Sequence, residues 1–205
     1  MSQPDRYPIP AATTRTELLV VNSRFIGSAA YTPTVSAARD FIAHVRTEIA
    51  DATHHAYGYL VGFGGSQNAG MSDAGEPPGT AGRPILTVVR GSGLGDITVV
   101  VTRFFGGTLL GTGGLVHAYG DTAKAVLAIT PRTERIETRT MLIKVGYADY
   151  ATIRRILAAH HATLTSEEFA ATITLTITLP AAEVGVCSAA LNNATAGQVT
   201  YVVSE

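Results

Sequence analysis

The spacing of hydrophobic positions divides the first two thirds of the chain into strands and helices. Short β-rich runs predict strands, and apolar residues at helical spacing predict helices. The predicted strands are residues 16–21, 24–31, 54–63 and 96–105, and the predicted helices are residues 35–50 and 115–129. Thr34 has the hydroxyl that suits a helix N-cap. Arg83-Pro84 resembles a helix start, although the ILTVV that follows is β-rich.

A different order of elements begins near residue 138. Strands are predicted at 141–147, 161–169, 171–180 and 197–203, with helices at 149–160 and 181–193. This βαββαβ order is that of a ferredoxin-like domain. The charged segment PRTERIET, residues 131–138, predicts a linker. We therefore expect an α+β chain of two domains, residues 1–137 and 138–205.

One long segment lacks any periodicity. Residues 64–82 read GGSQNAGMSDAGEPPGTAG, and this run of Gly, Ser, Asn, Asp and Pro predicts a loop. Loops of this length within a domain are either functional or disordered. The segment is therefore a first place to look for a site.

Composition narrows the classes of protein. The chain is 46% hydrophobic and 15% charged, which is typical of a globular protein, and no apolar run reaches the roughly 18 residues of a membrane span. A single cysteine, Cys187, excludes an internal disulfide, and the N-terminus lacks a signal-sequence pattern, so we expect a cytoplasmic protein without a membrane partner. The formal net charge is −1, so a nucleic-acid partner would need a local basic patch.

The stretch TRFFGGTLLGTGGLVHAYG, residues 102–120, is rich in glycine directly before a predicted helix. Its candidate anion-binding residues are Arg103, Phe104, Gly106, Gly107, Gly111, Gly113 and Gly114. A helix N-terminus offers free N–H groups to an anion, and Arg103 could add a forked contact. The alternative is that these glycines only permit tight backbone geometry. The pattern is neither GxxxxGK[ST] nor a Rossmann GxGxxG.

A second group of residues could form a pocket. Its members are His54, His55, Ser72, Asp73, Glu76, Thr80 and His117. A hydrolase or metal site using His55, Asp73 and Glu76 is one hypothesis, but adjacent histidines on a strand face opposite sides, and the spacing matches no metal motif. The other hypothesis is that Asp73 and Glu76 bond the loop's own backbone. No cofactor and no metal are predicted.

Three segments together resemble the YigZ/IMPACT family. They are DATHHAYGY, SDAGEPPGTAGRPIL and VVVTRFFGGTLLGTGGLVHAYG, which occur in the order and spacing typical of that family. The resemblance implies an N-terminal α/β domain similar to domain IV of elongation factor G. It also implies a C-terminal domain similar to domain V of that factor. Relatives commonly carry arginine at the position of His117.

The resemblance also implies a role in translation, because eukaryotic relatives regulate it by competing for a large activator protein. We therefore expect a non-catalytic binding protein that contacts RNA, the ribosome or a translation-associated protein, without specificity for DNA. The contact surface would combine Arg83 and Arg103 with the glycine-rich stretch, and Phe104, Phe105 and Tyr57 could stack on bases.

Overall fold

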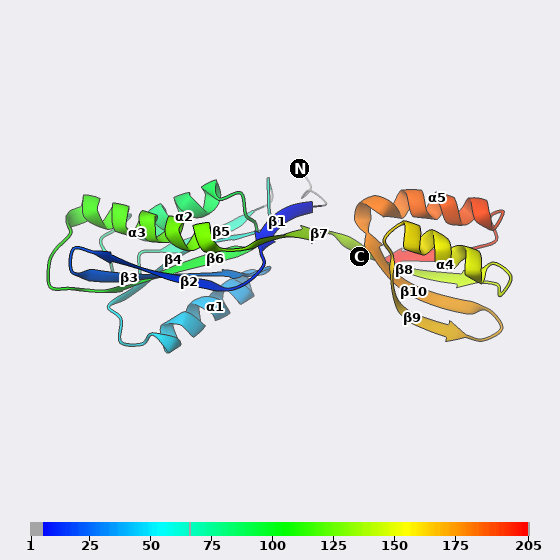
Figure 1. Ribbon diagram of the computed structural model, residues 1–205, viewed down its shortest axis with the longest axis horizontal. Coiled ribbons are helices and arrows are strands. Elements are labelled where there is room, and N and C mark those ends of the chain that lie inside the picture. The colour runs from blue at the N-terminus through cyan, green and yellow to red at the C-terminus, as the bar shows by residue number, and fades with distance from the viewer. Residues whose placement is uncertain (1–5, 66, 205) are drawn as a thin grey trace. The chain divides into compact units, whose positions relative to one another are not determined.

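The computed structural model describes residues 6–65 and 67–204, and the chain divides into two compact units, Met1–Arg135 and Ile136–Glu205 (Figure 1). The sequence-based boundary followed residue 137. Each unit has its own cluster of buried hydrophobic side chains.

A five-stranded antiparallel sheet forms the centre of the N-terminal unit. Its strands, in spatial order, are β2 (Thr14–Val20), β3 (Ser23–Tyr31), β6 (Ile97–Phe104), β4 (His54–Val61) and β5 (Asn68–Ser72). Helices α2 (Gly82–Gly91) and α3 (Gly111–Ile129) cover one face, and α1 (Val35–Glu48) covers the other (Figure 1). The fold is therefore three layers, with β6 in the middle of the central one.

The position of β6 explains its sequence. Residues Ile97–Arg103 are buried without alternation, because helices cover both faces of the sheet at this strand. On the α2–α3 side, Val99 and Val101 join the main core, whereas Val100 packs with Ile42 and Val45 of α1.

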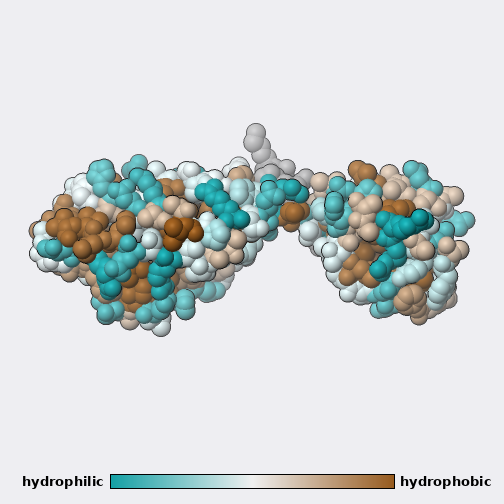
Figure 2. Space-filling view, in the orientation of Figure 1, coloured by the Kyte–Doolittle hydropathy of each residue, from teal (hydrophilic) through white to brown (hydrophobic). Residues whose placement is uncertain are grey.

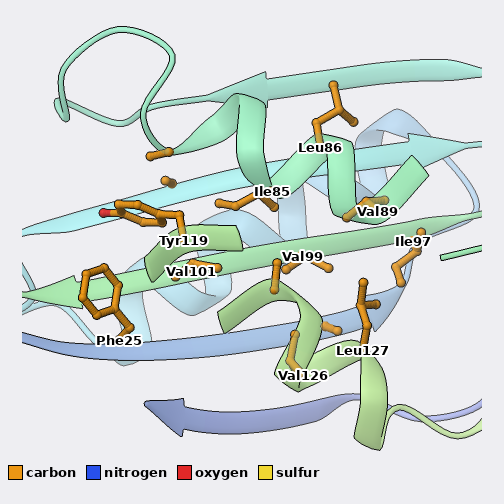
Figure 3. Close-up of a cluster of buried hydrophobic side chains, with 14 of the residues drawn as sticks. Phe25, Ile85, Leu86, Val89, Ile97, Val99, Val101, Tyr119, Val126 and Leu127 are labelled. Carbon is orange, nitrogen blue, oxygen red and sulfur yellow. The ribbon is translucent and has the colours of Figure 1, made fainter. Parts of the chain in front are cut away.

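The main core fills the space between the sheet and helices α2 and α3 (Figure 3). Phe25 and Tyr119 meet there edge to face, with ring centroids 5.2 Å apart and an interplanar angle of 88°. Burying a large apolar side chain contributes about 1.5–3 kcal/mol. At Gly58, a Cβ would lie 2.8 Å from the backbone nitrogen of Leu86, so glycine is what allows α2 to approach β4 this closely.

Most of the predicted strands and helices are confirmed. Thr34 caps α1 as expected, since its Oγ1 accepts a hydrogen bond of 3.0 Å from the Ala37 N–H. Arg83-Pro84 does begin a helix, because α2 starts at Gly82. Helix α3 starts at Gly111 rather than at residue 115, so the later glycines lie in its first turn.

Two predictions were wrong. The segment 64–82 is not wholly a loop, because it contains β5, the edge strand of the sheet. The residues of β5 show no alternation of apolar and polar positions that would predict a strand, and the strand forms because it pairs with β4. The predicted linker contains strand β7 (Arg132–Ile136), which pairs with β1 (Arg6–Pro10), a strand that the sequence analysis did not predict.

Buried Asp96 holds this two-stranded ribbon to the rest of the unit. Its carboxylate accepts hydrogen bonds from the Tyr7 hydroxyl (2.8 Å) and the Gly62 N–H (2.7 Å), and it pairs with Arg135 Nη1 at 2.5 Å. Burial and the bond to Asp96 raise the pKa of Tyr7 to about 12. Tyr7 therefore stays protonated and continues to donate at all ordinary pH values.

The C-terminal unit has the predicted ferredoxin-like order. Its elements are β8 (Thr138–Val145), α4 (Tyr150–Ala159), β9 (Thr163–Phe169), β10 (Ile173–Pro180), the short 3-10 helix η1 (Ala181–Glu183), α5 (Val184–Ala194) and β11 (Thr200–Ser204). The antiparallel sheet has the order β11-β8-β10-β9. Cys187 is buried in its core, and burial raises the pKa of the thiol. Across the described ranges, no helix combines the length and apolarity needed to cross a membrane.

Candidate functional site

A buried ion pair lies where the end of β6 meets the segment after β5. Arg103 Nη1 lies 2.7 Å from Glu76 Oε1, and the two side chains are only 6% and 4% exposed. The same oxygen accepts a hydrogen bond of 2.8 Å from the hydroxyl of Tyr119 on α3. Burial and the bond to Glu76 raise the pKa of Tyr119, so this hydroxyl remains a donor. One carboxylate oxygen thus joins a strand and a helix.

The other side of the Arg103 guanidinium is held more loosely. Nη2 lies 3.3 Å from Ser23 Oγ, and Nε is buried without a hydrogen-bond partner among the described residues. The rings of Phe25 and Phe105 lie 5.5 and 5.4 Å from the guanidinium carbon. Arg103 is therefore only 5% exposed, although it lines the hollow described below, and its contact with phosphate stays a prediction.

Asp73 organises the backbone ahead of α2. Its carboxylate accepts hydrogen bonds from the N–H groups of Gly79 (2.9 Å), Ala81 (3.0 Å) and Gly82 (2.8 Å). Burial alone raises the pKa of this carboxyl, but the three donors together bring it below its usual value. The expectation that Asp73 bonds its own loop is confirmed, whereas the same expectation for Glu76 is wrong, because Glu76 bonds Arg103 and Tyr119.

The two adjacent histidines face opposite sides of the sheet, as their alternation on β4 predicts. His54 lies on the α3 side, where Nδ1 is 2.9 Å from the carbonyl oxygen of Ala74 and Nε2 is 3.9 Å from Glu76 Oε1. His55 Nδ1 instead lies 3.1 Å from Thr102 Oγ1. Burial, followed by the positive charges of Arg46 and His54, lowers the pKa of His55.

The parts proposed for a hydrolase or metal site do not assemble. Ser72 Oγ accepts from the Ala74 N–H at 3.1 Å, and the Thr80 hydroxyl donates to the Pro77 carbonyl at 2.7 Å, so both side chains stabilise turns. In residues 6–65 and 67–204, no hydrogen bond or ion pair joins His55 to Asp73 or Glu76. In those ranges no three His, Cys, Asp or Glu side chains gather closely enough to hold a metal ion.

The glycines of the 106–114 stretch occupy their positions for different structural reasons. A Cβ at Gly106 would lie 1.7 Å from the carbonyl oxygen of Asn22, so only glycine fits there. Gly107 and Gly111 have φ angles of +81° and +69°, which side chains rarely adopt. A Cβ at Gly114 would lie 3.1 Å from Leu110 Cβ, whereas one at Gly113 would meet nothing within 4 Å. The backbone interpretation accounts for all of these glycines except Gly113.

A hollow of about 450 Å³, here called the glycine-loop pocket, opens beside this stretch. Its lining residues are Thr53, His54, Glu76, Pro77, Arg103, Phe105, Leu109, Leu110, Gly111, Thr112 and Leu115. Phe105 and Leu109 are 45% and 87% exposed at this position. Figure 2 shows apolar side chains gathered at the end of the unit where the β2–β3 turn and the start of α3 lie. The size and largely apolar lining are typical of a binding pocket.

A second surface, here called the α2–α3 groove, consists of two adjoining hollows between these helices, of about 390 and 400 Å³. Arg83, His117 and Lys124 line the first, and Lys124 and Arg132 line the second. Arg83 and His117, both predicted as site residues, thus lie together but apart from Arg103. The sequence analysis missed Lys124 and Arg132, which line these hollows, and Arg90, which is exposed on α2 but lines neither of them. The seven-residue spacing from Arg83 to Arg90 and from His117 to Lys124 places each pair on one helix face and could have indicated Arg90 and Lys124, whereas no such pattern indicates Arg132 on β7.

All three predicted stacking residues have a neighbouring side chain, and for Phe105 it is the Arg103 guanidinium described above. The guanidinium carbon of Arg24 lies 4.0 Å from the centroid of the Phe104 ring. Tyr57 packs on the α1 side of the sheet with Tyr59, at a centroid distance of 6.3 Å. Phe105 is the one of the three that lines the glycine-loop pocket.

Comparison with known proteins agrees with this architecture of an α/β unit followed by a ferredoxin-like unit. The Impact N-terminal domain profile matches residues 21–127, and the profile of a domain of unknown function, DUF1949, matches residues 143–198. The chain belongs to the IMPACT family.

Relatives cover almost the whole chain. The IMPACT family member YigZ of Escherichia coli is 37% identical over 202 residues, which is 98% of this chain and 99% of that protein. An IMPACT family member of Haemophilus influenzae is 32% identical over 97% of each chain. The crystal structure of a hypothetical protein matches with a TM-score of 0.72 and 36% identity, covering 98% of both chains. These matches therefore extend over both units of this chain.

Glu76→Ala is expected to lower the free energy of unfolding by about 3–5 kcal/mol, because it leaves Arg103 buried without a counter-charge. Glu76→Gln should cost less, since the amide oxygen can still accept from Tyr119 and Arg103. Urea unfolding measures both changes. Glu48→Ala, which removes the exposed partner of Arg15, is the control and should have a far smaller effect. A Glu76→Ala change as small as the control would contradict this role.

Asp73→Asn is expected to lower stability at neutral pH by an amount that disappears in acid. The pKa of Asp73 is lowered in the folded protein, so its contribution is present above the unfolded value of about 3.9 and is lost as the pH falls through the folded pKa. Urea unfolding of both proteins between about pH 7 and pH 2 should show curves that converge in acid. Asp121→Asn, at an exposed ion pair, is the control. Parallel curves over the whole range would exclude this linkage.

Gly106→Ala and Gly113→Ala are expected to act in opposite directions. The first should destabilise the protein, because its Cβ overlaps the Asn22 carbonyl oxygen. The second should raise the free energy of unfolding by up to about 1 kcal/mol, because alanine favours the helix and meets no neighbour. Thermal unfolding of the two variants checks this order, and a neutral Gly106→Ala would refute the packing argument.

Proposed function

We propose that this chain is a non-catalytic binding protein that acts in translation and contacts ribosomal or other structured RNA through the α2–α3 groove. The observation that carries the proposal is the distribution of charge on the N-terminal unit. Arg83, Arg90 and Arg132 are exposed, and none of them forms an ion pair within residues 6–65 and 67–204.

Most of the described carboxylates of the same unit have internal partners, and the two that have none in that part of the chain, Asp40 and Asp51, line neither hollow. Glu17, Glu48, Glu76, Asp96 and Glu134 pair with arginines away from the groove, and Asp73 bonds backbone N–H groups. Asp121 is the one acidic residue that lines either hollow, and it pairs with Lys124 at 2.9 Å. A nearly neutral protein can therefore present a local positive surface, which suits a phosphate backbone.

The family adds a reason to place this surface in translation. Eukaryotic members of the family are expected to regulate translation, and the fold implied for the N-terminal unit is similar to domain IV of elongation factor G. His117 stands where relatives commonly have arginine, and it lies beside Arg83 in the groove.

Co-sedimentation with ribosomes across a salt series tests the proposal. Three phosphate contacts predict a slope of the logarithm of the binding constant against the logarithm of salt of about −2 to −3. Arg83→Ala/Arg90→Ala should weaken binding and reduce the slope by about 1.5–2.

A matched control is available on the other face of the sheet. Arg39 and Arg46 are also exposed and seven residues apart, on α1, so Arg39→Ala/Arg46→Ala removes the same charge elsewhere. Equal losses in both double variants would indicate a non-specific charge effect and contradict the groove. No association at any salt concentration would exclude RNA and direct the search to a translation-associated protein.

A further inference from the structure

The floor of the glycine-loop pocket presents hydrogen-bond acceptors. Glu76 Oε1 receives both Arg103 Nη1 and the Tyr119 hydroxyl. Glu76 Oε2 has no hydrogen-bond partner in the described part of the chain. It is not fully buried, because in that part of the chain the fully buried polar side-chain atom without a partner is Arg103 Nε. Because Glu76 lines the pocket, this oxygen is the group of Glu76 that is available to an occupant.

His54 supplies a second acceptor. A carbonyl oxygen can only accept, so the contact of 2.9 Å between Nδ1 and the Ala74 carbonyl assigns the proton of the neutral ring to Nδ1. Nε2 then carries a lone pair, and its distance of 3.9 Å from Glu76 Oε1 is too long for a hydrogen bond. Two acceptors therefore stand at one end of a pocket whose walls are Phe105, Leu109, Leu110 and Leu115.

This arrangement restricts the chemistry of the occupant. A purely apolar side chain would bury the Glu76 oxygen without a donor, which is unfavourable. An ammonium group would gain little, because Arg103 already balances the charge of Glu76 and because the positive N-terminus of α3 lines the pocket. A neutral, flat, apolar body with N–H groups on one edge fits both the floor and the walls.

The pocket also adjoins the proposed RNA surface. Glu76 and Pro77 line the pocket, and Gly79, two residues further along, lines the α2–α3 groove. On α3, Thr112 and Leu115 line the pocket, and Val116 and His117 line the groove. An RNA strand whose phosphates lie along the groove would therefore pass the mouth of the pocket.

We propose that the glycine-loop pocket binds one unpaired, amino-bearing base of such a strand, stacked on Phe105 and donating hydrogen bonds to Glu76 Oε2 and His54 Nε2. This rests on the proposed function, since it names what the RNA places next to the groove. Guanine fits best, because its ring N–H and its exocyclic amine lie side by side on one edge. Bases turned out of a strand are commonly held by stacking and edge contacts of this kind.

Fluorescence anisotropy with labelled oligouridines of about ten nucleotides tests the proposal at low salt. The central position is uridine, guanosine or abasic. The wild-type protein should bind the guanosine oligonucleotide about tenfold more tightly than the abasic one, which is about 1.4 kcal/mol at 25 °C.

Two variants locate the contact. Phe105→Leu removes the stacking face at a half-exposed position, and Glu76→Gln replaces the free oxygen with a donor while preserving the shape; both should reduce the preference to less than about twofold. Tyr31→Leu replaces a similarly exposed aromatic residue at the C-terminal end of β3, away from the pocket. This variant should keep the full preference for guanosine. Thermal unfolding of each variant verifies that it is folded.

The outcomes separate this inference from the proposed function. Salt-dependent binding without any preference among the three oligonucleotides overturns the base pocket and leaves the groove in place. A guanine preference that survives in folded Phe105→Leu and Glu76→Gln also overturns it. The NMR signals of Thr112 and Leu115 report on occupancy of the pocket. If N-acetyl-tryptophanamide saturates these signals and guanosine does not, the pocket binds a protein side chain and the proposal is overturned. No RNA binding at any salt concentration overturns both proposals.

Discussion

The buried pair of Arg103 and Glu76 is the interaction on which the N-terminal unit depends. Arg103 is the second-last residue of the central strand, Glu76 belongs to the segment between β5 and α2, and Tyr119 brings α3 to the same carboxylate oxygen. Burying two charges is favourable only when geometry and further hydrogen bonds compensate for lost hydration. The pair therefore fixes the segment that separates the pocket from the groove, and both surfaces depend on it.

The same pair changes how the charge of the chain should be interpreted. A formal charge of −1 argues against a nucleic-acid partner only when charges are spread evenly. Here most carboxylates of the N-terminal unit have internal partners, whereas Arg83 and Arg132 are exposed and line the α2–α3 groove. The local charge of a surface then depends on which charges are internally paired rather than on their sum.

Much of the fold could be predicted because it follows from local periodicity. The alternation in β4 separates His54 from His55, and the uninterrupted apolar run of β6 reflects cover on both faces. What could not be predicted depends on partners distant in sequence. The edge strand β5 and the ribbon of β1 and β7 have weak patterns of their own, and Glu76 looks like an ordinary loop carboxylate until Arg103 and Tyr119 are placed beside it. Arg83 and Arg103 were grouped because both are cationic, yet one is exposed and the other enclosed.

The long-range nature of these contacts has a consequence during synthesis. Glu76 is 27 residues before Arg103 and 43 before Tyr119, and strand β1 finds its partner only in β7, at Arg132–Ile136. As the chain leaves the ribosome, strand β1 and the segment around Glu76 remain without their partners until most of the unit has emerged. We therefore expect the N-terminal unit to become resistant to protease in one late step, after β7 has left the exit tunnel, rather than by gradual consolidation.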